Sequence, residues 1–215
     1  MRARKVVTRS GKRIRGKFPS TKLGRMVHWE SLYERDAILH LEYHPLVVSY
    51  QEQPSVEIYY DPAGESHKYF PDFSALLSHG KELYFEVKPE RFLKKREVRA
   101  KLDSVAMRFE QLGRHFRVLT EQDIRREPLL TNLKAIHRSA KKVSYRETVL
   151  QLANSVSAGP TWSFRDLVTQ LGSAQSVLRL IRADHLRADL ETALTDESPV
   201  WLASTDGEAH GAFRL

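Results

Sequence analysis

Two short apolar segments carry acidic and basic side chains at a spacing that suits metal-assisted hydrolysis of a phosphodiester. Asp72 lies in YFPDF (69–73), and Glu86 and Lys88 lie in YFEVKP (84–89). A divalent cation held by carboxylates neutralises phosphate charge and lowers the pKa of a bound water. A neighbouring lysine can orient that water or stabilise the developing negative charge. Asp72, Glu86 and the Val87 carbonyl are therefore predicted metal ligands, and Asp72, Glu86 and Lys88 are predicted catalytic residues.

The strand that must carry Glu86 and Lys88 is expected over residues 82–88. Its odd-numbered residues from 83 to 87 are apolar, so strand alternation puts both charged side chains on the opposite face. A preceding strand over 67–73 should end near Asp72, and a tight turn at 78–81 should return the chain. The alternative is a surface Glu86–Lys88 ion pair beside an Asp72 that caps a turn.

A fourth acid is expected from a helix that begins within residues 20–41. Glu34 shares a helical face with Ala37, Ile38 and Leu41, so it lies in a stripe that faces the domain body. An acid there is costly unless it is paired or bound to a metal. Glu34 is therefore a predicted catalytic residue and metal ligand. Two alternatives stay open: pairing of Glu34 with a lysine or arginine, and Glu30 as the acid of the site.

The remaining elements of this region give an α/β layer arrangement. Strands are expected at 47–53, 56–60 and 116–119, and helices at 91–112 and 123–140, the latter broken near Pro128. The charged face of the 91–112 helix is expected to be exposed to solvent. Lys101 is the exception, because helical spacing puts it near the packed face.

Charge is concentrated at the start of the chain. The 215 residues carry a net charge of +8 and no cysteine, which excludes disulfides and thiolate zinc sites. The arm over residues 1–17 contains no acid, and its predicted DNA-binding residues are Arg2, Arg4, Lys5, Arg9, Lys12, Arg13, Arg15 and Lys17. The alternative is a solubilising tail. No apolar run reaches the roughly 18 residues of a membrane span, so we expect no membrane partner and a cytoplasmic location.

The pattern changes after a basic boundary at 138–142. Residues 143–215 are expected to form a second, mainly helical domain, and residues 18–142 the first. Helices are expected at 145–156, at 164–171 and after Ser173 or Ser176, with a turn at 189–194 and a strand at 199–203. Short helices with a terminal strand are typical of a winged-helix-like module. The alternative is a small helical cap that binds protein.

Four segments together, WESLYERD, YQEQPSVEI, YFPDF and YFEVKP, resemble the amino-terminal domain of the TnsA transposon endonucleases over about residues 17–140. This resemblance implies a restriction-endonuclease-like PD-(D/E)xK fold, a mixed sheet flanked by helices, followed by a small winged-helix-like domain. Carried over, the helical acid is Glu34, the strand acid Asp72 and the lysine Lys88. Glu86 falls where some members have glutamine. Gln53 matches a recurrent Gln-Pro, and it and Lys101 are expected near the site without an assigned role.

The resemblance also implies a function. It indicates a DNA endonuclease that uses one or two Mg²⁺ ions, with Mn²⁺ as a substitute, and cleaves the 5′ non-transferred strands at transposon ends. The implied partners are transposon-end DNA, a DDE transposase and an AAA+ regulator that contacts the carboxy-terminal domain. The alternatives are a restriction, repair or phage endonuclease of the same fold, and a non-catalytic DNA-binding adaptor. Four intact site side chains favour an enzyme.

Overall fold

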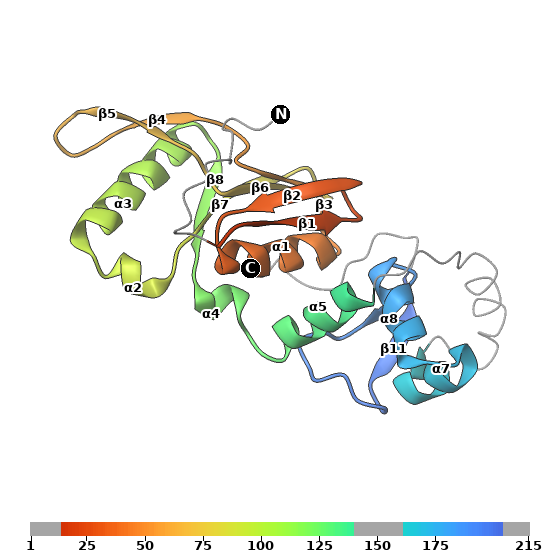
Figure 1. Cartoon of the computed structure of the whole chain (residues 1–215). Helices are drawn as coiled ribbons and strands as arrows, with labels where there is room; N and C mark the ends of the chain where they lie inside the picture. The colour runs from red at the N-terminus through yellow and green to blue at the C-terminus, as the bar shows by residue number, and fades with distance from the viewer. Residues whose placement is uncertain (1–13, 140–160, 204–215) are drawn as a thin grey trace. The chain divides into compact units, whose positions relative to one another are not determined.

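A computed structural model describes residues 14–139 and 161–203 (Figure 1). The predicted DNA-binding residues from Arg2 to Arg13 and the predicted helix 145–156 lie outside the described residues. The described chain divides into two compact units, the first ending at Arg125 and the second beginning at Arg126.

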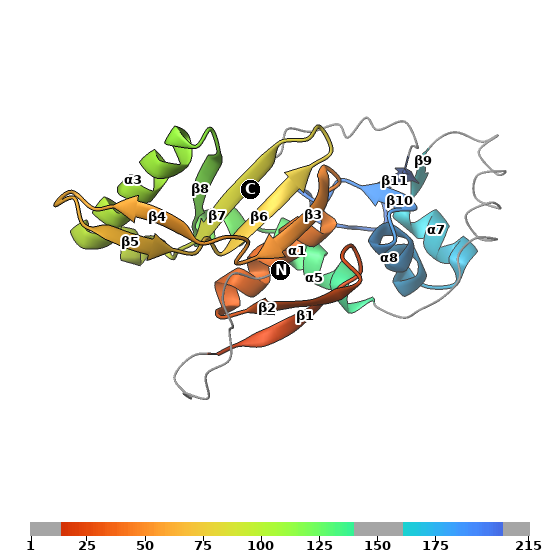
Figure 2. The same ribbon diagram turned by 90° about the horizontal axis from the view of Figure 1, so that it is seen from above.

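A four-stranded mixed sheet forms the centre of the first unit, in the order β3-β6-β7-β8 (Figure 2). Strand β6 is antiparallel to both β3 and β7, whereas β8 runs parallel to β7. The sheet strands are β3 (Val47–Glu52), β6 (Phe73–Leu77), β7 (Glu82–Val87) and β8 (His115–Leu119). Two separate hairpins are β1 (Gly16–Ser20) with β2 (Arg25–Trp29), and β4 (Glu57–Tyr60) with β5 (Ser66–Tyr69).

Helices cover both faces of this sheet. They are α1 (Leu32–Tyr43), α2 (Glu90–Leu93), α3 (Arg96–Gln111) and α4 (Glu121–Ile124). Tyr50 of β3 donates a hydrogen bond from its hydroxyl to Glu42 of α1, at 2.7 Å. On the opposite face, the rings of Tyr84 in β7 and Phe109 in α3 lie with centroids 5.0 Å apart. A mixed sheet flanked by helices is compatible with the expected nuclease fold.

The helix expected from residue 20 is wrong in its first half, because a β1–β2 hairpin precedes α1. Three donors at the hairpin turn converge on the buried Glu42: the Ser20 hydroxyl at 2.6 Å, the Thr21 N–H at 2.7 Å and the Lys22 N–H at 3.0 Å. The hairpin therefore depends on an acid far along the chain. Lys17, expected in the basic arm, lies in β1.

We expect Glu42→Ala to lower the free energy of unfolding by about 3 kcal/mol, because several buried donors would lose their acceptor together. Urea denaturation followed by circular dichroism measures this change. Glu110→Ala, at an exposed position of α3, is the matched control and should stay within about 0.5 kcal/mol of the wild type. Equal stabilities of the two variants would contradict the assigned role of Glu42.

Two further expectations about element limits are wrong. The strand expected over 67–73 ends at Tyr69, and the chain re-enters a different sheet at Phe73, so Asp72 leads into β6. Pro71 has no N–H to donate and cannot continue a ladder in this link. The single helix expected over 91–112 is divided into α2 and α3, with extended backbone at Lys95 (φ −77°, ψ 123°).

The second unit combines helices with a three-stranded antiparallel sheet of order β10-β11-β9. Its elements are α5 (Leu129–Arg138), β9 (Thr161–Ser163), α7 (Phe164–Leu171), α8 (Ala174–Arg182), β10 (Leu186–Ala188) and β11 (Pro199–Leu202). Ser163 and Ser173 cap α7 and α8, and Gly172 ends α7 at φ 77°. Of the two serines expected to start the third helix, Ser173 is the cap. The strands β9 and β10 were not expected, whereas the turn expected at 189–194 is present at residues 190–191.

Helix α5 groups with this second unit, whereas the sequence analysis assigned it to the first domain. Of the helices in the described ranges, none is both long enough and apolar enough to cross a membrane.

Candidate active site

Asp72 and the end of β7 lie next to each other because of the β6–β7 register. Phe73 pairs with Phe85, so the residue before β6 lies beside the last residues of β7. The contact is direct: the Val87 N–H donates to Asp72 Oδ2 at 2.8 Å. The hairpin therefore places the Asp72 carboxylate at the strand end that carries Glu86 and Lys88.

Glu86 and Lys88 contact each other, which confirms the prediction that they share a strand face. Lys88 Nζ lies 2.8 Å from Glu86 Oε1. The other oxygen of the buried Glu86 carboxylate accepts the Tyr69 hydroxyl at 2.6 Å. The Lys88 N–H donates to the Leu119 carbonyl at 2.9 Å, which continues the pairing of β7 with β8 by one residue. Tyr69 is a site residue that sequence reasoning missed, although it opens the YFPDF segment.

Glu34 lies in the first turn of α1, where Ser31 caps the helix. The Ser31 side chain accepts the Glu34 N–H at 3.1 Å, and Glu34 Oε2 accepts the Glu30 N–H at 2.7 Å. The Glu34 carboxylate therefore bonds to backbone at the helix start, and the described structure gives it no lysine or arginine partner. This contact is a capping interaction of the kind that stabilises helix termini.

The three acids interact electrostatically with one another. Burial raises the pKa of Asp72 well above its ordinary value, and the charges of Glu86 and Glu34 raise it further. Burial also raises the pKa of Glu34, to which the Glu86 charge contributes. Burial alone would lower the pKa of Lys88, but the carboxylates of Glu86, Asp72 and Glu34 outweigh it and raise that pKa.

The raised pKa of Asp72 has a consequence for stability. A carboxyl with a higher pKa in the folded state binds its proton more tightly there, so its contribution to stability is present at low pH and is lost as pH rises above about 4. Asparagine does not ionise, so Asp72→Asn should not lose stability in this way. As pH rises, the thermal midpoint of Asp72→Asn should therefore increase relative to that of the metal-free wild type. Thermal unfolding at a series of pH values measures the difference, and a difference independent of pH would contradict it.

The donor set of the site fits a hard divalent cation. Three carboxylates supply hard oxygens. A bound cation would offset the mutual repulsion that adds to burial in raising the pKa of Asp72. Glu34 and Asp72 each have one oxygen on a backbone N–H. Both oxygens of Glu86 are engaged, Oε2 by the Tyr69 hydroxyl and Oε1 by Lys88 Nζ, so a cation would compete with Lys88 for Oε1. Among the described residues, the oxygens of Glu34, Asp72 and Glu86 are farther apart than the potential ligand atoms of a second group of side chains.

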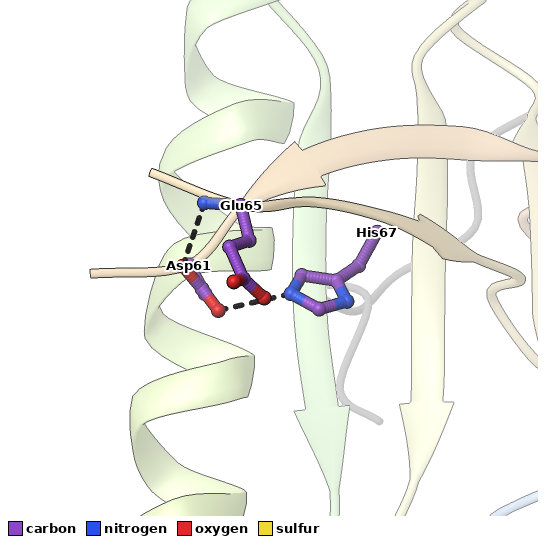
Figure 3. A group of neighbouring side chains, drawn as sticks. All are labelled: Asp61, Glu65 and His67. Carbon is purple, nitrogen blue, oxygen red and sulfur yellow. Dashed lines mark hydrogen bonds and ion pairs between the residues drawn. The ribbon is translucent and has the colours of Figure 1, made fainter. Parts of the chain in front are cut away.

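That second group lies on the β4–β5 hairpin and consists of Asp61, Glu65 and His67 (Figure 3). Its potential ligand atoms all lie within 4.8 Å of one another. Asp61 Oδ1 accepts the N–H groups of Ala63 and Glu65, both at 2.9 Å, and Asp61 Oδ2 lies 2.9 Å from His67 Nε2. These bonds are those of an aspartate that orders a turn. These hydrogen bonds explain why the three side chains lie together, and no bound metal is needed to explain it.

Of the two residues expected near the site, Gln53 contacts Asp72 and Lys101 contacts the ring of Tyr69. Gln53 directly follows β3, and its N–H donates to the Asp72 carbonyl at 2.9 Å. Lys101 of α3 is exposed, so the expectation that it departs from the solvated face of its helix is wrong. Its Nζ lies 5.4 Å from the centroid of the Tyr69 ring, whose hydroxyl binds Glu86.

In this mixed α/β domain the Asp72 and Glu86 carboxylates and the Lys88 ammonium group lie at the end of β7, an arrangement compatible with a nuclease fold. Residues 44–121 match the family model described as TnsA-like endonuclease N terminal. This part of the chain is therefore similar to the amino-terminal domain of TnsA-like endonucleases, which agrees with the sequence resemblance. The match includes Asp72, Glu86 and Lys88 and leaves Glu34 outside. No curated protein matches the chain.

Proposed function

We propose that the protein is a metal-dependent DNA endonuclease that cuts the 5′ non-transferred strands at transposon ends. The observation that carries the proposal is the contact of Asp72 with Val87 and of Glu86 with Lys88, inside the region that is similar to TnsA-like endonucleases. The family match supports a nuclease of the transposition type. The cleaved strand, the ion and the partners are the proposed parts.

Asp72, Glu86, Glu34 and the Val87 carbonyl would hold the cation, and we propose Mg²⁺ because the donors are hard oxygens. When bound, the ion supplies phosphate neutralisation and a water of lowered pKa. Tyr69 holds one oxygen of Glu86 and so limits the directions that this carboxylate can take. Lys88, cationic beside these acids, orients the attacking water or stabilises charge on the phosphate oxygens.

We propose that residues 1–17 bind DNA, because their eight lysines and arginines, including Lys17 of β1, suit the phosphate backbone. We propose that the second unit is a winged-helix-like module. The proposal is supported by the order of its elements, β9, α7, α8, β10 and β11, in which the strands form one three-stranded sheet. We propose that this unit contacts an AAA+ regulator and that the whole protein acts with a DDE transposase.

Strand-specific cleavage tests this function. The full chain, combined with its transposase and regulator, is given DNA that is end-labelled separately on each strand of a transposon end, with and without Mg²⁺. We expect Mg²⁺-dependent cuts on the 5′ strands. Cuts without any transposase would favour a restriction or repair nuclease, and intact 5′ strands with a fully active transposase would favour a non-catalytic adaptor.

A further inference from the structure

The residue after β3 has an unusual backbone. Gln53 has φ 46°, in the left-handed region, and Asp184 is the other non-glycine residue of the described ranges with a positive φ. A side chain with a Cβ is strained in this region, where glycine is not. Such strain persists only where the surrounding structure enforces it, and it collects at functional sites.

The surroundings of Gln53 do enforce its conformation. Before it, the buried Glu52 carboxylate is held by the Arg25 guanidinium through two bonds of 3.0 and 2.7 Å. Its own N–H donates to the Asp72 carbonyl at 2.9 Å. The backbone of Gln53 is thus bonded to the residue whose carboxylate receives the Val87 N–H. A change at Gln53 would reach Asp72 directly.

The side chain adds a second, independent feature. Gln53 is 91% buried, and its carboxamide oxygen has no hydrogen-bond partner in the described chain. Buried carbonyl oxygens are nearly always bonded, so an open acceptor needs an explanation. Two unfavourable features on one residue beside Asp72 indicate a local compromise made for function.

We propose that Gln53 is a positioning residue of the acidic site: its strained backbone fixes Asp72 through the N–H, and its carboxamide oxygen accepts a hydrogen bond from water that the bound cation brings. This role rests on the proposed function, because it requires the site to bind a cation. Gln53 touches no reacting atom and acts on Asp72 and on the hydration of the ion.

A glycine variant distinguishes a positioning role of Gln53 from a purely structural role. Gln53→Gly keeps the N–H, relieves the strain and removes the carboxamide, whereas Gln53→Asn keeps a carboxamide on a residue that tolerates this region. Asp184→Gly relieves the same kind of strain in the second unit and is the matched control. The measurements are the thermal midpoint and the Kd for Mn²⁺ by calorimetry, each on the full chain.

We expect Gln53→Gly to keep or raise the midpoint while its Kd for Mn²⁺ rises by about tenfold or more. Gln53→Asn should recover part of that loss, and Asp184→Gly should bind Mn²⁺ like the wild type. Unchanged Mn²⁺ affinity in Gln53→Gly would overturn the proposal. So would a lower midpoint or failure to fold, because the residue would then serve stability. A wild type that binds no Mn²⁺, or an Asp72→Ala variant that binds it equally well, would instead contradict the proposed function.

Discussion

Asp72→Asn should reduce Mg²⁺-dependent cleavage of transposon-end DNA by about a thousandfold or more while leaving the fold intact. The variant loses the negative charge that a cation needs. Its side-chain oxygen can still accept the Val87 N–H, which Asp72 receives at 2.8 Å. Cleavage rates under single-turnover conditions, together with the calorimetric Kd for Mn²⁺, measure the effect, and both should change.

The control for this experiment is Glu65→Gln, which changes an acid of the Asp61 hairpin group and should leave cleavage and Mn²⁺ affinity unaltered. At neutral pH the thermal midpoint of Asp72→Asn should equal or exceed that of the metal-free wild type, because burial and the Glu86 and Glu34 charges raise the pKa of Asp72. Wild-type cleavage by Asp72→Asn would remove Asp72 from the catalytic site. Loss of cleavage in Glu65→Gln would place the cation at the hairpin instead.

Lys88→Met should slow cleavage by about a hundredfold to a thousandfold, and Mn²⁺ should bind as tightly as before or more tightly. Methionine keeps an unbranched chain of similar reach but removes the ammonium group. Because Lys88 Nζ lies 2.8 Å from Glu86 Oε1, its loss frees that oxygen for a cation. The metal-free protein should become less stable, since the buried Glu86 loses its ion-pair partner.

The opposite responses of rate and affinity distinguish a catalytic lysine from a structural ion pair. Lys94→Met, at an exposed position between α2 and α3, is the matched control and should cleave like the wild type. If Lys88→Met lost Mn²⁺ affinity and stability together while the metal-saturated rate stayed normal, Lys88 would serve only to hold Glu86. Added Mg²⁺ should restore most of the midpoint lost in Lys88→Met.

The site follows from local rules to a large extent. Strand alternation alone predicts that Glu86 and Lys88 share a face, and the 2.8 Å contact confirms it. The apolar stripe of α1 is equally local, and Ala37, Ile38 and Leu41 are buried as predicted. Side-chain periodicity within one element is encoded by neighbouring residues, so it can be read without knowledge of the rest of the fold.

Features that depend on distant partners were not predictable. The β1–β2 hairpin is held by Glu42, some twenty residues away, and its own residues give no clear alternating pattern. Tyr69 becomes a site residue only because β5 ends where its hydroxyl reaches Glu86. The strained backbone of Gln53 depends on the simultaneous positions of β3 and Asp72. In each of these cases the local conformation is set by tertiary contacts, which the spacing of residues in the sequence does not reveal.

The hairpin of β1 and β2 supplies no residue to the acidic site, yet it is attached to two elements that do. Its turn is bonded to Glu42 in the helix that begins near Glu34, and Arg25 is bonded to Glu52, which precedes Gln53. Random mutagenesis should therefore recover loss-of-function alleles at Ser20 and Arg25 as well as at the residues of the acidic site. The alleles at Ser20 and Arg25 should be temperature-sensitive and open to second-site suppression, whereas alleles at Asp72 and Lys88 should be neither.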